Sequence, residues 1–142
     1  MLKIGHGLLY LWIGFNLVLA FSIVFSMVFL RNNAPALSIL FDSSSIVTIT
    51  PNALKTINAL AVLMNTTIVS LCSLSLILIW KGLLKQKWVF TTLSLSLGFV
   101  QLIGFVSDYY LENKNLLANG FSTVILLSGL FLSLNIFKTK KK

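Results

Sequence analysis

The sequence predicts an all-α integral membrane protein, a four-helix up-down bundle with both termini in the cytoplasm. Two bulk properties predict this class: 57% of the 142 residues are hydrophobic with a mean hydropathy of +0.95, and only 10% are charged. A soluble domain carries about 25% charged residues. The third observation is the placement of the charges, which leaves four uncharged stretches of at least 20 residues: 4–30, 56–80, 88–107 and 115–137. Each can cross a hydrocarbon core of about 30 Å as a helix.

The composition also excludes several classes of protein. A soluble enzyme, a nucleic-acid-binding domain and a secreted disulfide scaffold do not have this hydropathy. The chain has one cysteine, Cys72, and one histidine, His6, so it can form no internal disulfide and no metal or haem site that needs several such ligands. We therefore expect no metal and no cofactor. Because the lysines that give the net charge of +8 flank the apolar stretches, we expect them to meet anionic lipid head groups and not nucleic acid.

We expect a single transmembrane domain over residues 1–142, with spans at about 7–30, 53–80, 88–107 and 116–137. The first apolar stretch exceeds the roughly 7–15 residues of a signal-peptide core, which predicts a retained span. Gly7 and Gly14 lie seven residues apart on one face of this span and predict a close approach by a neighbouring helix.

The second helix has a clear start signal, since Thr50 can cap it and Pro51 can occupy its first position. The connections at 81–87 and 108–114 are short, which predicts that the second, third and fourth helices are antiparallel neighbours.

The first extracytoplasmic loop, 31–50, is longer than the other connections. Its segment 36–41 is apolar but too short to span a membrane, which predicts a short interfacial segment. Residues 42–45 then read as a turn.

Lysine and arginine predict the orientation, because positive charge is retained in the cytoplasm during insertion. With a cytoplasmic N-terminus, the cytoplasmic side holds Lys3, Lys81, Lys85, Lys87, Lys138, Lys140, Lys141 and Lys142. The opposite side holds Arg31, Lys55 and Lys114. The three tryptophans, Trp12, Trp80 and Trp88, then form a cytoplasmic aromatic belt.

Polar side chains at membrane depth are costly and mark the candidate site. Four of them fall in the outer half of the spans and predict a polar pocket that opens outward: Asn58, Gln101, Asp108 and Asn119. The alternative is that such amides only hold helices together through hydrogen bonds, each contributing about 0.6–2 kcal/mol. A further alternative for Asp108 is that it is a solvated residue at a helix end or forms an ion pair with Lys114.

Helix packing is the expected role of a second set of residues. Asn16 and Asn65 lie near mid-depth, where an amide can bond to a neighbouring helix. Gly98 forms a small-xxx-small pair with Ser94, and Gly129 forms another with Ser133. Each pair favours either a dimer face or close packing within one bundle.

The sequence predicts no catalytic residue. His6 lies at the cytoplasmic end, whereas Asp108 and Glu112 lie about 30 Å away across the membrane, so no acid–base pair shares one centre. We expect a non-enzymatic accessory or partner-binding subunit of the bacterial inner (plasma) membrane, with another membrane protein or a second copy as its partner. The alternative is a binder or carrier of a small or lipid-like molecule that uses the polar pocket.

Overall fold

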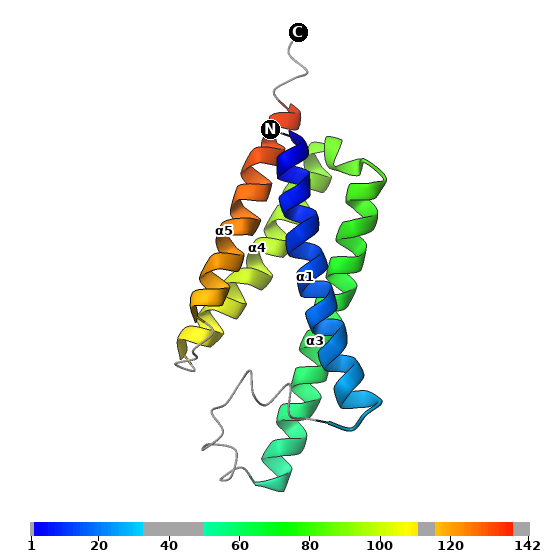
Figure 1. Ribbon diagram of the computed structural model, residues 1–142, viewed down its shortest axis with the longest axis vertical. Helices are drawn as coiled ribbons and strands as arrows, with labels where there is room; N and C mark the ends of the chain where they lie inside the picture. Colours follow the sequence, from blue (N-terminus) through cyan, green and yellow to red (C-terminus); the bar gives the residue numbers. More distant parts are fainter. Residues whose placement is uncertain (1, 33–49, 111–115, 138–142) are drawn as a thin grey trace.

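The computed structural model describes residues 2–32, 50–110 and 116–137, and in this part of the chain it confirms the all-helical class. These described residues form four α-helices: α1 (Leu2–Val28), α3 (Pro51–Trp80), α4 (Lys87–Tyr110) and α5 (Leu116–Ser133). Two short 3₁₀ turns, η2 (Leu83–Lys85) and η3 (Leu134–Phe137), follow α3 and α5. The helices alternate in direction, so α1 begins and α5 ends at the same end of the molecule (Figure 1). The predicted interfacial segment 36–41, the turn at 42–45 and the basic tail 138–142 lie outside the described residues.

Three helices are long and apolar enough to cross a membrane, at Lys3–Val28, Pro51–Trp80 and Lys87–Tyr109. The fourth predicted span differs from the expectation. Its α-helix has only 18 residues, which at about 1.5 Å per residue gives about 27 Å, and the chain then tightens into η3. The four residues of η3 add about 8 Å at about 2.0 Å per residue, so α5 and η3 together reach the thickness of a hydrocarbon core.

The helix ends follow from local chemistry. The predicted cap of α3 is confirmed, because the Thr50 hydroxyl accepts a hydrogen bond from the Ala53 N–H at 3.3 Å and Pro51 is the first helical residue. After α3 the chain turns at Gly82, whose φ of 68° favours glycine. After α1, Arg31 has a φ of 51°, and the Asn32 N–H donates to the Ser26 carbonyl at 3.0 Å.

Helix α1 is the centre of the bundle. It packs against both α3 and α5, and α4 packs mainly on α5 (Figure 1). The expectation that the second and third helices pack on each other is wrong in extent, because α3 and α4 touch at only a few positions and η2 bridges them. Away from η2, the α4–α5 pair diverges from α1 and α3 (Figure 1).

The close contact between α1 and α5 is made at Gly5, and not at the predicted Gly7 or Gly14. A Cβ on Gly5 would lie 2.8 Å from the Ser133 backbone nitrogen, and a Cβ on Gly129 would lie 3.1 Å from the Leu9 side chain. A Cβ on Gly7 or Gly14 would meet nothing within 4 Å, so the prediction for these two residues is wrong. They lie on another face of α1 than the one that contacts α5.

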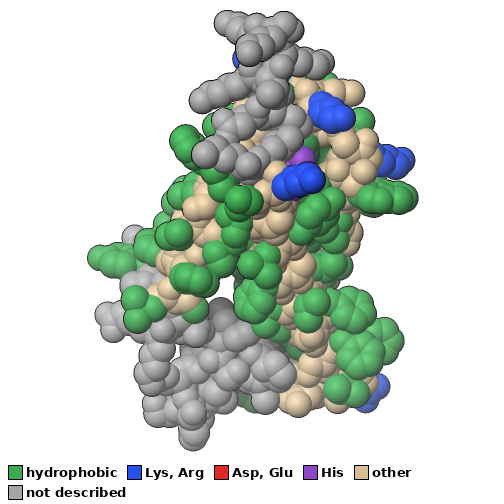
Figure 2. All heavy atoms as spheres, turned by 45° about the horizontal axis from the view of Figure 1, so that its top comes forward, with side chains coloured by type: hydrophobic (Ala, Val, Ile, Leu, Met, Phe, Trp, Pro, Cys, Tyr) green, Lys and Arg blue, Asp and Glu red, His purple; other side chains and the backbone are tan. Residues whose placement is uncertain are grey.

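The buried apolar residues form two clusters. The larger cluster lies near η2 and joins all four helices through residues such as Ile13, Ile79, Leu97 and Leu126. The smaller one joins α1 to α3 through Ile23, Met27 and Ala61. Large apolar side chains are exposed on every helix, as expected where lipid is the solvent. On the face that Figure 2 shows, lysine and arginine side chains lie near the two ends, and hydrophobic ones cover much of the surface between them.

The described cations divide between the ends of the bundle. Lys3, at the start of α1, lies at the same end as η2 and the start of α4, with Lys81, Lys85 and Lys87 (Figure 1). Arg31 and Lys55 lie at the opposite end, after α1 and in the first turns of α3.

Candidate functional site

Three of the four predicted pocket residues meet between α4 and α5. The Gln101 amide donates from Nε2 to the Asn119 carbonyl at 3.1 Å and to the Thr123 hydroxyl at 2.9 Å. The Asn119 amide donates to the carboxylate of Asp108, which lies about two turns after Gln101 on α4. Gln101 and Asp108 are buried, with 6% and 8% of their surface exposed. These groups bond to one another, and the described hollow that Gln101 borders is lined mainly by apolar side chains.

The hydrogen bonds continue to α1. The Ser122 hydroxyl donates to the Gln101 side-chain oxygen at 3.4 Å, and the Trp12 indole N–H donates to the Ser122 oxygen at 2.8 Å. We call the six residues that these bonds link the polar network: Trp12, Gln101, Asp108, Asn119, Ser122 and Thr123. The network ties three helices together at sites where an unpaired polar group would be costly.

Trp12 corrects one prediction. It is buried with 4% of its surface exposed and belongs to the polar network, so it is not part of an aromatic belt. Trp80 and Trp88 are exposed near η2, at the place expected for such a belt. Sequence reasoning missed the burial of Trp12 because its distance from the start of the helix fits both a belt at the membrane surface and a place inside the bundle. Only the rotation of α1 about its axis decides between the two.

Asn58 lies apart from the other three pocket residues. It belongs to α3, which packs on α1, and it takes part in none of the bonds of the polar network. Its side-chain oxygen is buried and accepts no hydrogen bond from the described residues. A count along the chain places Asn58 at a similar depth but carries no information on which helices are neighbours.

The two mid-depth amides bond within their own helices. Asn16 donates to the Trp12 carbonyl and Asn65 to the Ala61 carbonyl, both at 2.8 Å. Neither amide donates across to another helix among the described residues. The two small-residue pairs also differ: Gly129 packs against α1, whereas a Cβ on Gly98 would meet open space.

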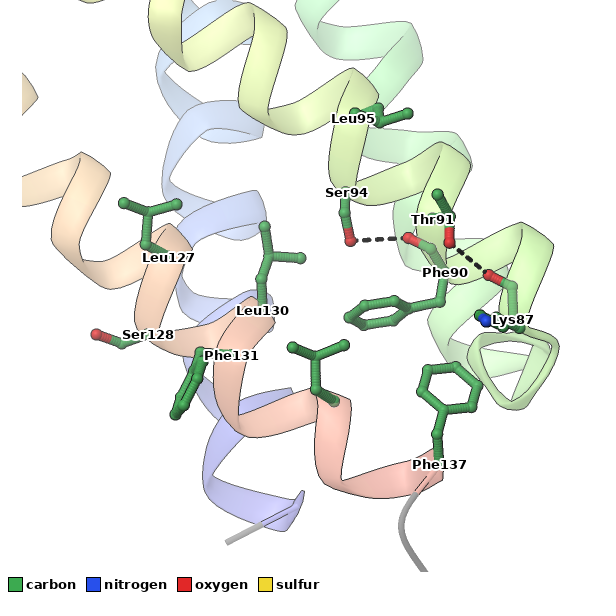
Figure 3. Close-up of a pocket in the computed structure, with 11 residues that line it drawn as sticks. Lys87, Phe90, Thr91, Ser94, Leu95, Leu127, Ser128, Leu130, Phe131 and Phe137 are labelled. Carbon is green, nitrogen blue, oxygen red and sulfur yellow. Dashed lines mark hydrogen bonds between the residues drawn. The ribbon is translucent and has the colours of Figure 1, made fainter. Parts of the chain in front are cut away.

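Gly98 is open because a groove runs between α4 and α5. One part, of about 730 Å³, lies near the start of α4 and is almost wholly apolar. A second part of about 420 Å³ continues toward the polar network, and Leu127 borders both parts. Figure 3 shows the first part, with Phe90 and Ser94 on the α4 side and Leu130 and Phe131 on the α5 side. We call both parts together the α4–α5 groove.

A polar face of α3 is the other unusual surface. Thr66, Thr67 and Ser70 are exposed in the middle of this helix, and each hydroxyl donates to the carbonyl four residues earlier. These bonds satisfy the donors but leave oxygen lone pairs facing outward. We call these three residues the hydroxyl face of α3.

The described residues contain no group of three His, Cys, Asp or Glu side chains that could hold a metal ion. No family model, no curated protein and no solved structure matches the chain.

Proposed function

We propose that this chain is a four-span protein of a bacterial plasma membrane that acts by binding a partner membrane protein and catalyses no reaction itself. Both termini of the chain would lie in the cytoplasm, because the end of the bundle with Lys3 and the lysines around η2 carries more positive charge than the opposite end. The polar network supports a structural role for the buried polar groups, since they form hydrogen bonds with one another.

The observation that carries the proposal is the hydroxyl face of α3. This helix is the least buried of the three long ones, and α1 is its main neighbour. Polar side chains are unfavourable against lipid, whereas they stabilise contacts between membrane helices through hydrogen bonds and close packing. A second membrane helix that donates hydrogen bonds to Thr66, Thr67 or Ser70 would cover this surface.

The alternative function, binding of a small molecule in an outward polar pocket, has weaker support. Gln101, Asp108 and Asn119 are occupied with one another, and Asn58 lies on a different helix.

Photo-crosslinking in native membranes tests the proposal. A photoreactive amino acid replaces Leu63, which is exposed one turn before Thr67, and as a control Phe99, which is similarly exposed on α4. We expect a discrete protein adduct from position 63 that is lost when Thr67→Val and Ser70→Ala are added, and no such adduct from position 99. An adduct of twice the chain mass would identify the partner as a second copy. Equal labelling from both positions, or an adduct that ignores the two hydroxyl substitutions, would contradict the proposal.

A further inference from the structure

Two hollows adjoin at the start of α4. The first part of the α4–α5 groove is apolar and is walled by side chains such as Phe90, Leu127 and Phe131. Beside it lies a shallower hollow of about 620 Å³, whose lining includes Gln86, Trp88 and Thr92. Lys87 and Thr91 border both hollows. An apolar groove whose edge carries the ammonium of Lys87 and the hydroxyl of Thr91 matches an amphipathic ligand.

The rim carries positive charge that no described carboxylate balances. Lys81, Lys85 and Lys87 are all exposed around η2. Asp108, the one Asp or Glu among the described residues, lies 21 residues further along α4, about 31 Å away at about 1.5 Å per residue. Lysines at a membrane surface attract anionic lipids with about 1 kcal/mol each. The exposed Trp88 belongs to the residue type that settles at the level of the head groups.

The shape of the groove favours a flexible chain over a helix. Phe90 of α4 and Phe137 of η3 meet edge to face across its end, with ring centroids 5.4 Å apart (Figure 3). A partner helix has a diameter of about 10 Å and needs a straight, unobstructed groove. A hydrocarbon chain can bend past this aromatic pair.

We propose that this site binds an anionic phospholipid, with its phosphate at Lys87 and Thr91 and one acyl chain in the α4–α5 groove. The site is separate from the hydroxyl face of α3, so it is independent of the proposed partner. The α4–α5 pair diverges from the rest of the bundle (Figure 1), and the bound lipid would contact both helices of this pair.

Native mass spectrometry of the full-length protein in detergent tests this proposal. The protein is titrated with dioleoylphosphatidylglycerol and, separately, with dioleoylphosphatidylcholine. We expect one phosphatidylglycerol to bind more tightly than phosphatidylcholine. Lys87→Gln should weaken the phosphatidylglycerol complex about fivefold, the factor that corresponds to about 1 kcal/mol. Lys81→Gln removes a charge from the same connection but borders neither hollow, and it should change the affinity less than twofold.

A second variant tests the apolar part of the site. Thr91 is exposed, so Thr91→Trp can fill both hollows without entering the core, and circular dichroism would verify that helicity is retained. We expect this variant to lose the bound phosphatidylglycerol. Equal affinities for the two lipids would overturn the proposal, as would equal effects of Lys87→Gln and Lys81→Gln. A dimer that Thr91→Trp dissociates, with lipid binding unchanged, would show that a second copy occupies the groove instead.

Discussion

Gly5 and Gly7 lie two positions apart on α1 and have opposite surroundings. The backbone of α5 fills the space where a Cβ on Gly5 would project, at 2.8 Å, while Gly7 faces open space. We therefore expect Gly5→Ala to lower the free energy of unfolding by about 1–3 kcal/mol, because α5 must move to make room. Gly7→Ala is the matched control and should not destabilise the protein. The free energy of unfolding of both variants would be measured in mixed micelles that contain an increasing fraction of a denaturing detergent. Equal effects of the two substitutions would contradict the packing of α1 on α5.

Gln101 tests the polar network in the same assay. Its amide makes two donated bonds and accepts one from Ser122, so Gln101→Leu removes three links between α4 and α5. Hydrogen bonds between membrane helices contribute about 0.6–1.7 kcal/mol, and we expect a loss of about 1 kcal/mol. Leu102→Ala, at the exposed neighbouring position, should cost less. A Gln101→Leu variant as stable as the parent would show that the network adds nothing to stability.

These residues also show what the sequence can reveal. The sequence predicts that Gln101, Asp108 and Asn119 lie together because all three fall in the outer half of the spans, and depth follows from counting along a helix. The hydrogen bonds between these residues depend on the rotation of α4 and α5 about their own axes. The hydropathy of a segment does not predict this rotation. Trp12 and Gly5 were missed for the same reason.

At the scale of the helices, start signals and apolar lengths were informative. The second predicted helix begins at Pro51 and ends at Trp80, as its cap and its apolar length indicate. The end of α5 could not be predicted, because Leu134 and Phe137 continue the apolar stretch while the backbone tightens into η3. Hydropathy does not distinguish an α-helix from a 3₁₀ turn.

The cap of α3 gives a prediction of its own. Thr50→Ala removes the oxygen that accepts the Ala53 N–H, and such a loss typically costs about 1 kcal/mol. Because Thr50 is exposed, no packing change should contribute. Thr56→Ala removes another exposed hydroxyl, which bonds only within the helix, and should have a smaller effect. Unfolding measurements on the two variants would compare them directly, and a larger loss for Thr56→Ala would argue against the cap.

At the scale of the whole molecule, the sequence indicated the four helices of the described residues but not which ones are neighbours. The short connection between α3 and α4 suggests a packed pair, yet α1 occupies the central position, and α3 and α4 touch at only a few positions and are bridged by η2. An apolar face of a membrane helix can contact either lipid or another helix. The pattern of apolar residues therefore does not predict which helices pack against each other.

Orientation in the membrane is the property of the whole chain that charge should control. We expect an alkaline phosphatase fused within the loop 31–50 to be active outside the cytoplasm, and a fluorescent protein fused after Lys142 to fluoresce inside it. The opposite pattern would exclude a bundle with both termini in the cytoplasm.

The lysines around η2 should set this orientation more strongly than the cations of the other end. Short loops beside span ends dominate the choice of side; Lys81 and Lys85 lie in one such loop, and Lys87 begins the helix that follows it. Replacing the three together with glutamine should leave a fraction of the molecules inverted. The matched triple substitution of Arg31, Lys55 and Lys114 should leave the orientation unchanged, because it increases the difference in charge between the two sides. A cysteine introduced at Ser44 and labelled with an impermeant maleimide reports the outcome, since the native Cys72 is buried. Inversion by the second set but not by the first would reverse the proposed assignment of sides.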